Sequence, residues 1–216
     1  RANSVDIVAR VRNPNPKAGV PNYSVIFILV DREGQEIGRI DKETYLLPGS
    51  LNYIAALDVP LAGDLARVKV ETTSEPRFAE LPANVSAPEF NSFLRDRRTR
   101  TIGNTPIEEQ KGIVTNTGTL GYREVDVTGV ALDAAGNVVG ISTTFIGNFR
   151  VGEQREFTLQ WPVPVQPTAR VIVLPSTNIY EENNILTPVG DPNRLRDESP
   201  NEPEVQGATD QLPENQ

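Results

Sequence analysis

A dense group of arginines is the first place in this 216-residue sequence where binding chemistry could concentrate. Arg95, Arg97, Arg98 and Arg100 all fall within one short segment. Guanidinium groups recognise phosphate and carboxylate groups, so the cluster could hold a phosphate, an acidic glycan or an anionic lipid headgroup. The other interpretation is an edge strand whose cations discourage aggregation, and a single basic cluster in an acidic chain favours it. We therefore treat the four arginines as a possible interaction patch.

Carboxylates offer two further kinds of chemistry. Asp31 with Glu33, and Asp133 with Asn137, could bind Ca²⁺, which takes oxygen ligands. Both segments lack a dense D-x-D-x-D-G pattern, and hairpin geometry alone explains an Asp followed by Gly. A glycosidase needs only two carboxylates, but no pair stands out, and the polar cluster at 181–184 fits an irregular chain exit equally well. The sequence therefore predicts no enzyme, no metal and no cofactor.

Composition removes several other classes of function. The chain has no His and no Cys, which excludes disulfides, thiolate or imidazole metal ligands, cysteine nucleophiles and the usual general base at neutral pH. Its net charge of −8 repels nucleic acid, which we exclude as a partner. No run approaches the ~18 apolar residues of a membrane span. Because the sequence begins at Arg1, we expect contact with a membrane only through a segment that lies upstream.

One short pattern of residues occurs twice along the chain. Asn13 and Asn116 are 103 residues apart, and the D-x-x-G segments that begin at Asp31 and Asp133 are 102 apart. Landmarks that stay in step over a whole domain length indicate two tandem copies of one module. A chain of this length, with 38% hydrophobic residues, can form two cores of ordinary domain size.

The periodicity within each copy is that of β-strands. Apolar and polar residues alternate over 5–12 and 51–59, whereas 25–30 is apolar on both faces, as in a central strand. The turns at 31–35 and 133–137 each supply a Gly where a hairpin needs positive φ. The predicted fold is all-β, with two tandem immunoglobulin-like antiparallel β-sandwiches.

The same pattern predicts three regions. Residues 1–81 form the first domain, 82–190 form the second domain with its linker, and 191–216 form a disordered acidic tail that is rich in Pro, Glu, Asn and Gln. A possible first strand at 93–102 precedes the second copy, but almost nothing precedes the equivalent strand of the first. We therefore expect the first domain to lack its first strand, which would be encoded upstream, and to expose a strand edge.

Short motifs in the first copy resemble two families of immunoglobulin-like sandwiches. The LEA14-like (WHy) domain is similar in its Asn-Pro-Asn and in its late strand, and the FxLYD domain of exported proteins is similar in its core strand. The segments that carry these resemblances are Asn13-Pro14-Asn15, Leu47-Pro48-Gly49, Leu57-Asp58-Val59-Pro60 and Phe27-Ile28-Leu29-Val30-Asp31. The match covers about residues 5–73 and, more loosely, 107–175, with Val30 where the FxLYD pattern has Tyr. Because neither family has known catalysis, the resemblance implies a non-enzymatic module.

The predicted function is that of a non-catalytic structural or binding protein of the cell envelope. It would lie outside the cytoplasm, at the cell surface or in the periplasm, anchored through an upstream segment, with an unknown protein or envelope component as partner. One alternative is a LEA14-like desiccation or stress-protective protein. The other is a glycan- or Ca²⁺-dependent adhesin, for which Trp161 could stack on a sugar. Its place in the strand row at 157–161 instead predicts a core position for Trp161.

Overall fold

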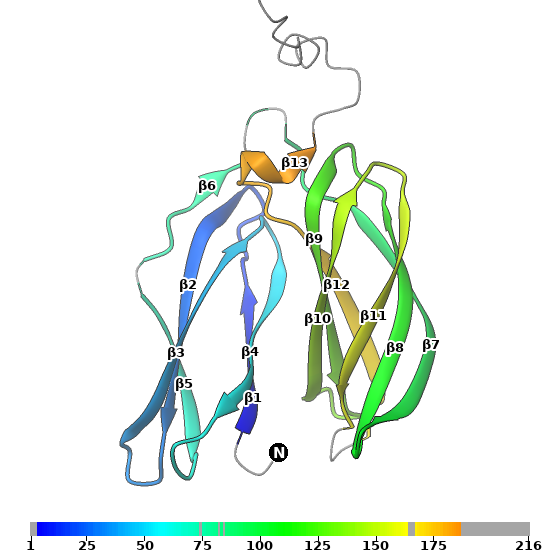
Figure 1. Ribbon diagram of the computed structural model, residues 1–216. Coiled ribbons are helices and arrows are strands. Elements are labelled where there is room, and N and C mark those ends of the chain that lie inside the picture. The colour runs from blue at the N-terminus through cyan, green and yellow to red at the C-terminus, as the bar shows by residue number, and fades with distance from the viewer. Residues whose placement is uncertain (1–3, 74, 82, 84, 164–166, 187–216) are drawn as a thin grey trace, which may run out of the picture. The chain divides into compact units, whose positions relative to one another are not determined.

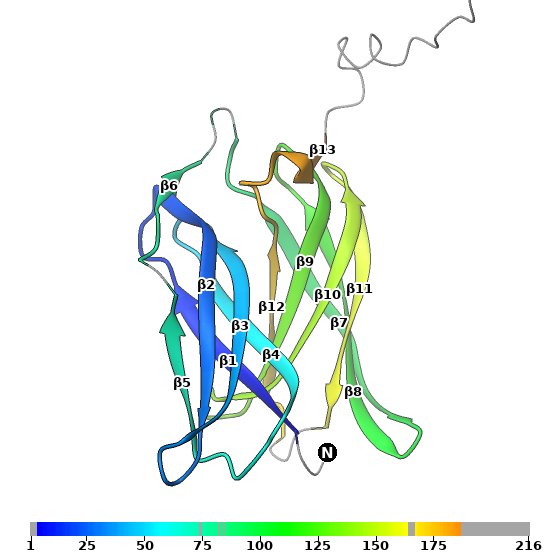
Figure 2. The ribbon, with the colours of Figure 1, turned by 60° about the vertical axis from the view of Figure 1, so that its left-hand side comes forward.

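The computed structural model contains two β-sandwiches, each made of two antiparallel sheets (Figures 1 and 2). It describes residues 4–73, 75–81, 83, 85–163 and 167–186, so the expected acidic tail at 191–216 lies outside the described residues. Within them, the one helical element is the short 3-10 turn η1 (Glu182–Asn184). The predicted fold class is confirmed. Among the described residues, no helix has the length and apolar character needed to cross a bilayer.

The first sandwich places a two-stranded sheet, β1 with β4, against a sheet of order β3-β2-β5. A short strand, β6, pairs with the start of β2. The central strand β2 buries its last four residues on both faces, as its continuous apolar run predicts. The strands are β1 (Ser4–Arg12), β2 (Ala18–Val30), β3 (Glu36–Leu46), β4 (Leu51–Pro60), β5 (Arg67–Thr72) and β6 (Ala79–Glu80).

The second sandwich repeats this plan and adds one strand. Its sheets have the orders β11-β8-β7 and β10-β9-β12, and the short strand β13 pairs with the start of β9. Strands β8 to β12 match β1 to β5 in order and pairing, whereas β7 has no counterpart among the described residues of the first sandwich. The strands are β7 (Phe90–Ile102), β8 (Thr105–Asn116), β9 (Gly121–Leu132), β10 (Val138–Phe149), β11 (Gln154–Pro162), β12 (Arg170–Ser176) and β13 (Ile185–Leu186).

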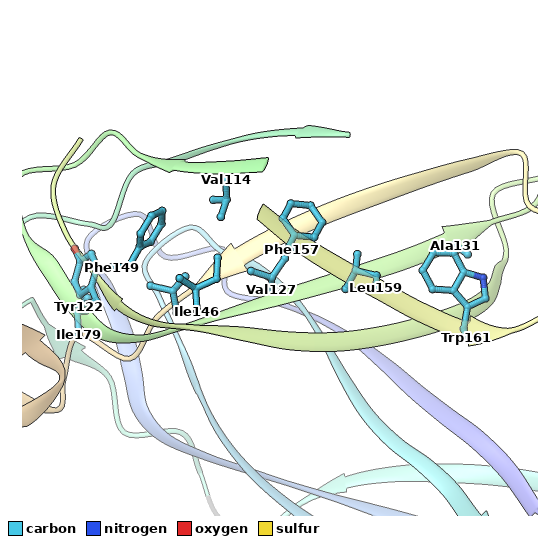
Figure 3. Packing of buried hydrophobic residues seen from close by; sticks show 11 residues of the cluster. Val114, Tyr122, Val127, Ala131, Ile146, Phe149, Phe157, Leu159, Trp161 and Ile179 are labelled. Atoms are coloured by element: carbon cyan, nitrogen blue, oxygen red, sulfur yellow. The ribbon is translucent and has the colours of Figure 1, made fainter. Parts of the chain in front are cut away.

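Each sandwich has its own hydrophobic core between its sheets. In the second, Phe157, Leu159 and Trp161 follow one another along β11 and point into the core (Figure 3). Trp161 is only 2% exposed, which confirms the predicted core position. Close packing also requires glycine at position 129, because a Cβ at Gly129 would lie 2.2 Å from Leu159 Cδ1. The buried members of the first core are Ile7, Ala9, Val25, Phe27, Leu29, Ile54, Ala56 and Val59.

The two sandwiches belong to one compact unit that ends at Leu186. Tyr45 Oη and Ser176 Oγ, from β3 and β12, form a hydrogen bond of 2.8 Å. Burial raises the pKa of the Tyr45 phenol, so this tyrosine stays neutral at physiological pH. A small apolar cluster adds a second contact. It consists of Val130, Leu132 and Ile141 of the second sandwich, against which Val8, Tyr53, Ala55 and Ile172 pack.

Candidate functional site

The four arginines of the predicted interaction patch lie on β7, the outermost strand of the β11-β8-β7 sheet. Each forms an ion pair with a glutamate. Arg95 Nη1 lies 3.3 Å from Glu156 Oε1, and its side chain is half exposed. The other three pair with two adjacent residues of β8, Glu108 and Glu109. We call Arg97, Arg98, Arg100, Glu108 and Glu109 the arginine–glutamate ladder.

Glu108 is almost completely buried and has a donor for each carboxylate oxygen. Its Oε1 accepts from Arg97, while its Oε2 accepts from Trp161 Nε1 at 3.2 Å and from Thr168 Oγ1 at 3.0 Å. Arg97 also donates to the Thr168 carbonyl at 3.0 Å. A buried carboxylate needs such partners because an unpaired charge in the interior is costly. Glu108 therefore ties β7, β8 and β11 together at one point.

Glu109 is the second buried carboxylate, with 2% of its side chain exposed. Arg98 Nη2 lies 2.6 Å from Oε1, Arg100 Nη1 lies 3.1 Å from Oε2, and Gln160 Nε2 donates to Oε2 at 2.9 Å. The hydrogen bonds from these donors lower the Glu109 pKa to about 2, and Arg98 contributes most. Burial acts in the opposite direction. Glu109 is thus a fixed anion at neutral pH and not a proton donor.

The next residue of β8, Gln110, stabilises an irregularity in the strand pair. The pairing of β7 with β8 shifts between Leu94 and Arg97. Gln110 is buried, and its Nε2 donates to the carbonyls of Arg95 and Asp96 at 3.4 and 3.3 Å. The Gln110 side chain therefore supplies a hydrogen-bond donor where the regular pairing of the two strands is interrupted.

The ladder changes what the basic cluster can do. The side chains of Arg97, Arg98 and Arg100 are between about a third and a half exposed, but each already pairs with a carboxylate. An external phosphate or anionic lipid would have to compete with these fixed carboxylates. The structure thus gives the arginines a role in joining β7 to β8, and their use as an interaction patch stays a prediction.

The candidate oxygen ligands for Ca²⁺ accept hydrogen bonds within their own turns. Asp31 Oδ1 accepts from the Gln35 amide at 2.7 Å, and Asp133 Oδ1 accepts from the Asn137 amide at 2.8 Å. The Asn137 side chain, which also donates to Asp133, contributes most to lowering the Asp133 pKa. Within the described residues, no three acidic side chains converge as a metal site. Hairpin chemistry accounts for both motifs.

The repeated asparagines have equivalent structural roles. Asn13 Nδ2 donates to the Ala18 and Leu47 carbonyls at 2.8 and 2.9 Å. Asn116 is completely buried and donates to the carbonyls of Leu120 and Phe149 at 2.8 and 3.4 Å. In each copy one amide therefore joins two segments at the same end of the sandwich. The polar cluster at 181–184 is likewise structural, since Asn184 Oδ1 accepts from the Glu124 amide at 2.9 Å.

A different candidate site is the edge of β1. In the second sandwich, β8 lies between β11 and β7, but β1 pairs only with β4 among the described residues. The strand is long, and it ends beside the Asn13 loop. Strands at the edge of a sheet are places to which another strand can add. The expectation that the first domain lacks its first strand, which would be encoded upstream, and exposes a strand edge stays a prediction.

Sequence reasoning did not identify Glu108 and Glu109 as partners of the arginines. The available signal was charge complementarity across a tight turn, because the Arg-rich segment at 97–100 is followed by Gly103 and then by the two glutamates. Gly103 has φ of +60° and separates β7 from β8. No protein-family model matches the chain, and no curated protein matches it. The fold defines the class as a tandem β-sandwich protein.

Proposed function

We propose that this chain is a non-catalytic structural or binding protein of the cell envelope that acts outside the cytoplasm. The observation that supports the binding role is the edge of β1, which pairs only with β4 among the described residues, whereas the equivalent strand β8 lies between β11 and β7. Exposed strand edges add strands from other polypeptides through main-chain hydrogen bonds. This edge supports a binding role for the first sandwich.

The roles of the chemically capable side chains support a non-enzymatic function. Glu108 and Glu109, the two buried carboxylates of β8, accept fixed donors from their own sandwich. Asp133 is held by its hairpin in the same way. Groups that catalyse acid–base chemistry need access to a substrate and a pKa near the working pH. These carboxylates instead hold strands and turns together.

The proposed location rests on the resemblance of residues 27–31 to the FxLYD domain of exported proteins. Protease shaving of intact source cells tests it, with an antibody to the second sandwich and a cytoplasmic protein as control. We expect loss of the antibody signal while the control stays intact. Protection until the cells are lysed would contradict the envelope role and would favour the stress-protective alternative.

A further inference from the structure

The outer face of the β3-β2-β5 sheet has an apolar centre. Val25, Phe27 and Leu29 of β2 belong to the first core. Successive side chains of a strand point to opposite faces of its sheet, so Ile26 and Ile28 point outward. Ile28 is buried and Ile26 is partly buried, although both lie on the side of the sheet away from the core. The side chains that flank them on β3 and β5 set the chemistry of this face.

Charged residues flank the centre in rows of one sign. Residues paired across an antiparallel ladder lie on the same face of the sheet. Arg39 of β3 and Lys69 of β5 both pair with Ile28, which forms a basic row across the three strands. Two residues along, Asp41 and Glu71 flank β2 in the same way and form an acidic row. All four charged side chains are exposed, so the face presents a basic row beside an acidic row.

The equivalent face of the second sandwich is a packed interface. Val130 of β9 lies 102 residues after Ile28 and pairs with Ile141 of β10 and Ile172 of β12. This apolar row packs against residues of β1 and β4 from the first sandwich. The outer face of this kind of sheet can therefore take part in sheet-on-sheet packing. In the first sandwich, arginine and lysine flank the equivalent position, which favours a partner of complementary charge.

Little of this charge is neutralised within the chain. Arg39 Nε lies 3.0 Å from Glu36 Oε1, and both side chains are about half exposed. Lys69, Asp41 and Glu71 form no ion pair with another described residue. An exposed pair such as that of Arg39 with Glu36 contributes little free energy and can rearrange. The two rows are therefore available to charges on another molecule.

The two rows make the face complementary to itself. When two such sheets meet face to face, a two-fold axis across the strands, between the rows, brings the basic row of one copy over the acidic row of the other. Arg39 then lies opposite Asp41 of the second copy, and Lys69 lies opposite Glu71. A two-fold axis along β2 would instead bring Arg39 over Lys69. Strand twist separates the sheets farther from the axis, so the four central charges determine the arrangement.

We propose that the outer face of the β3-β2-β5 sheet binds the same face of a second copy of this chain, about the axis across the strands. Ile26 and Ile28 lose their remaining contact with water, and two copies of each charge pair set the register. The face is small, since strands lie about 4.8 Å apart and β5 has only six residues. The dimer is therefore reversible, with an interface at the low end of specific interface areas. This inference goes beyond the proposed function and needs neither the envelope location nor the edge of β1.

Sedimentation equilibrium of the full chain, from about 10 μM to about 1 mM, tests for the dimer in the range where small interfaces associate. We expect the average mass to rise toward twice that of the monomer, and the rise to weaken as salt screens the charge pairs. A monomer across the whole range would overturn the proposal. A mass that grows beyond the dimer would also overturn it, because a two-fold interface closes at two copies.

Reversal of the basic row tests the face. Arg39→Glu with Lys69→Glu places like charges in all four facing pairs and should raise the dissociation constant at least about tenfold. Arg10→Glu with Arg12→Glu is the matched control, because it makes the same change in net charge at exposed positions of β1, in the other sheet. Circular dichroism melting checks that both variants fold. Equal weakening by the control, or unchanged association after the row reversal, would contradict the proposal.

Exchange of the two charges on β5 tests the axis. Lys69→Glu with Glu71→Lys keeps the net charge, and the altered residues face each other again in the variant's own dimer. The variant should therefore self-associate as the wild type does. It should bind the wild type at least about tenfold more weakly, because a glutamate then faces a glutamate and a lysine faces a lysine. Fluorescence anisotropy of wild type labelled at its amino terminus measures this mixed pair. A folded variant that stays monomeric, or one that binds the wild type as well as the wild type binds itself, would refute the proposed dimer.

Discussion

Glu109 shows what a buried carboxylate does when it lies inside a sheet. Arg98, Arg100 and Gln160 donate to it from the strands on either side of β8. Its two oxygens are thereby satisfied, and the negative charge is balanced by guanidinium groups that reach solvent. The side chains with the most reactive groups therefore connect neighbouring strands.

This arrangement predicts how stability depends on pH. The folded Glu109 pKa lies at about 2, below the ordinary value of 4.5. The unfolded chain therefore takes up this proton first as the pH falls, so the contribution of the charged group is complete above about pH 4.5 and is lost between there and about pH 2. The variant Glu109→Gln should be less stable than the wild type at pH 7, and the difference should shrink across that window.

Urea unfolding followed by Trp161 fluorescence at a series of pH values measures this difference within the second sandwich. Glu33→Gln is the control, because it makes the same chemical change at an exposed hairpin residue of the first sandwich. If the free energies of unfolding of Glu109→Gln and the wild type differ by the same amount down to pH 2, then protonation of Glu109 does not change the stability that the arginine–glutamate ladder provides.

At the scale of elements, the hairpins depend on glycine where the chain turns. Gly136 has φ of +88°, and no atom lies within 4 Å of the position that a Cβ would take. Backbone conformation is therefore the only obstacle to a side chain there. Gly136→Ala should reduce the stability of the second sandwich by about 1 kcal/mol, since L-residues disfavour the left-handed region.

Gly147 provides the matched comparison for this substitution. It lies within β10 without positive φ, and the nearest atom to its Cβ position is the Arg123 carbonyl oxygen at 3.8 Å. Gly147→Ala should leave the urea midpoint of Trp161 fluorescence unchanged or raise it slightly, because alanine reduces the entropy of the unfolded chain. Equal losses in the two variants would refute the conformational explanation.

The elements could be predicted from the sequence better than the site. Alternation at 5–12 and the continuous apolar run at 25–30 correctly indicated β1 and β2, because strand burial follows directly from side-chain period. The partners of the arginines could not be found in this way. Burial of Glu108 depends on a register shift in β7 and on Trp161, which lies far along the chain, and neither is encoded in local pattern.

At the scale of the whole molecule, the two sandwiches share one arrangement of strands, but the second has an additional strand at the edge of one sheet. The second has β7 on its edge and fully buries Tyr122, Phe149 and Trp161. The first has a two-stranded sheet, and Phe27 is its one aromatic side chain at 0% exposure among the described residues. Buried apolar area is the main source of stability, so the first sandwich should be the less stable of the two.

This difference predicts the order of unfolding. Trp161 is the only tryptophan of the chain and lies in the second core, so its fluorescence reports the second sandwich alone. Far-ultraviolet circular dichroism reports the strands of both. In urea, the circular dichroism change should begin before the fluorescence change, because probes of a single cooperative transition coincide and probes of two transitions do not.

Superimposed curves would instead mean that contacts such as Tyr45–Ser176 couple the sandwiches into one cooperative unit. In that case Tyr45→Phe should separate the two curves.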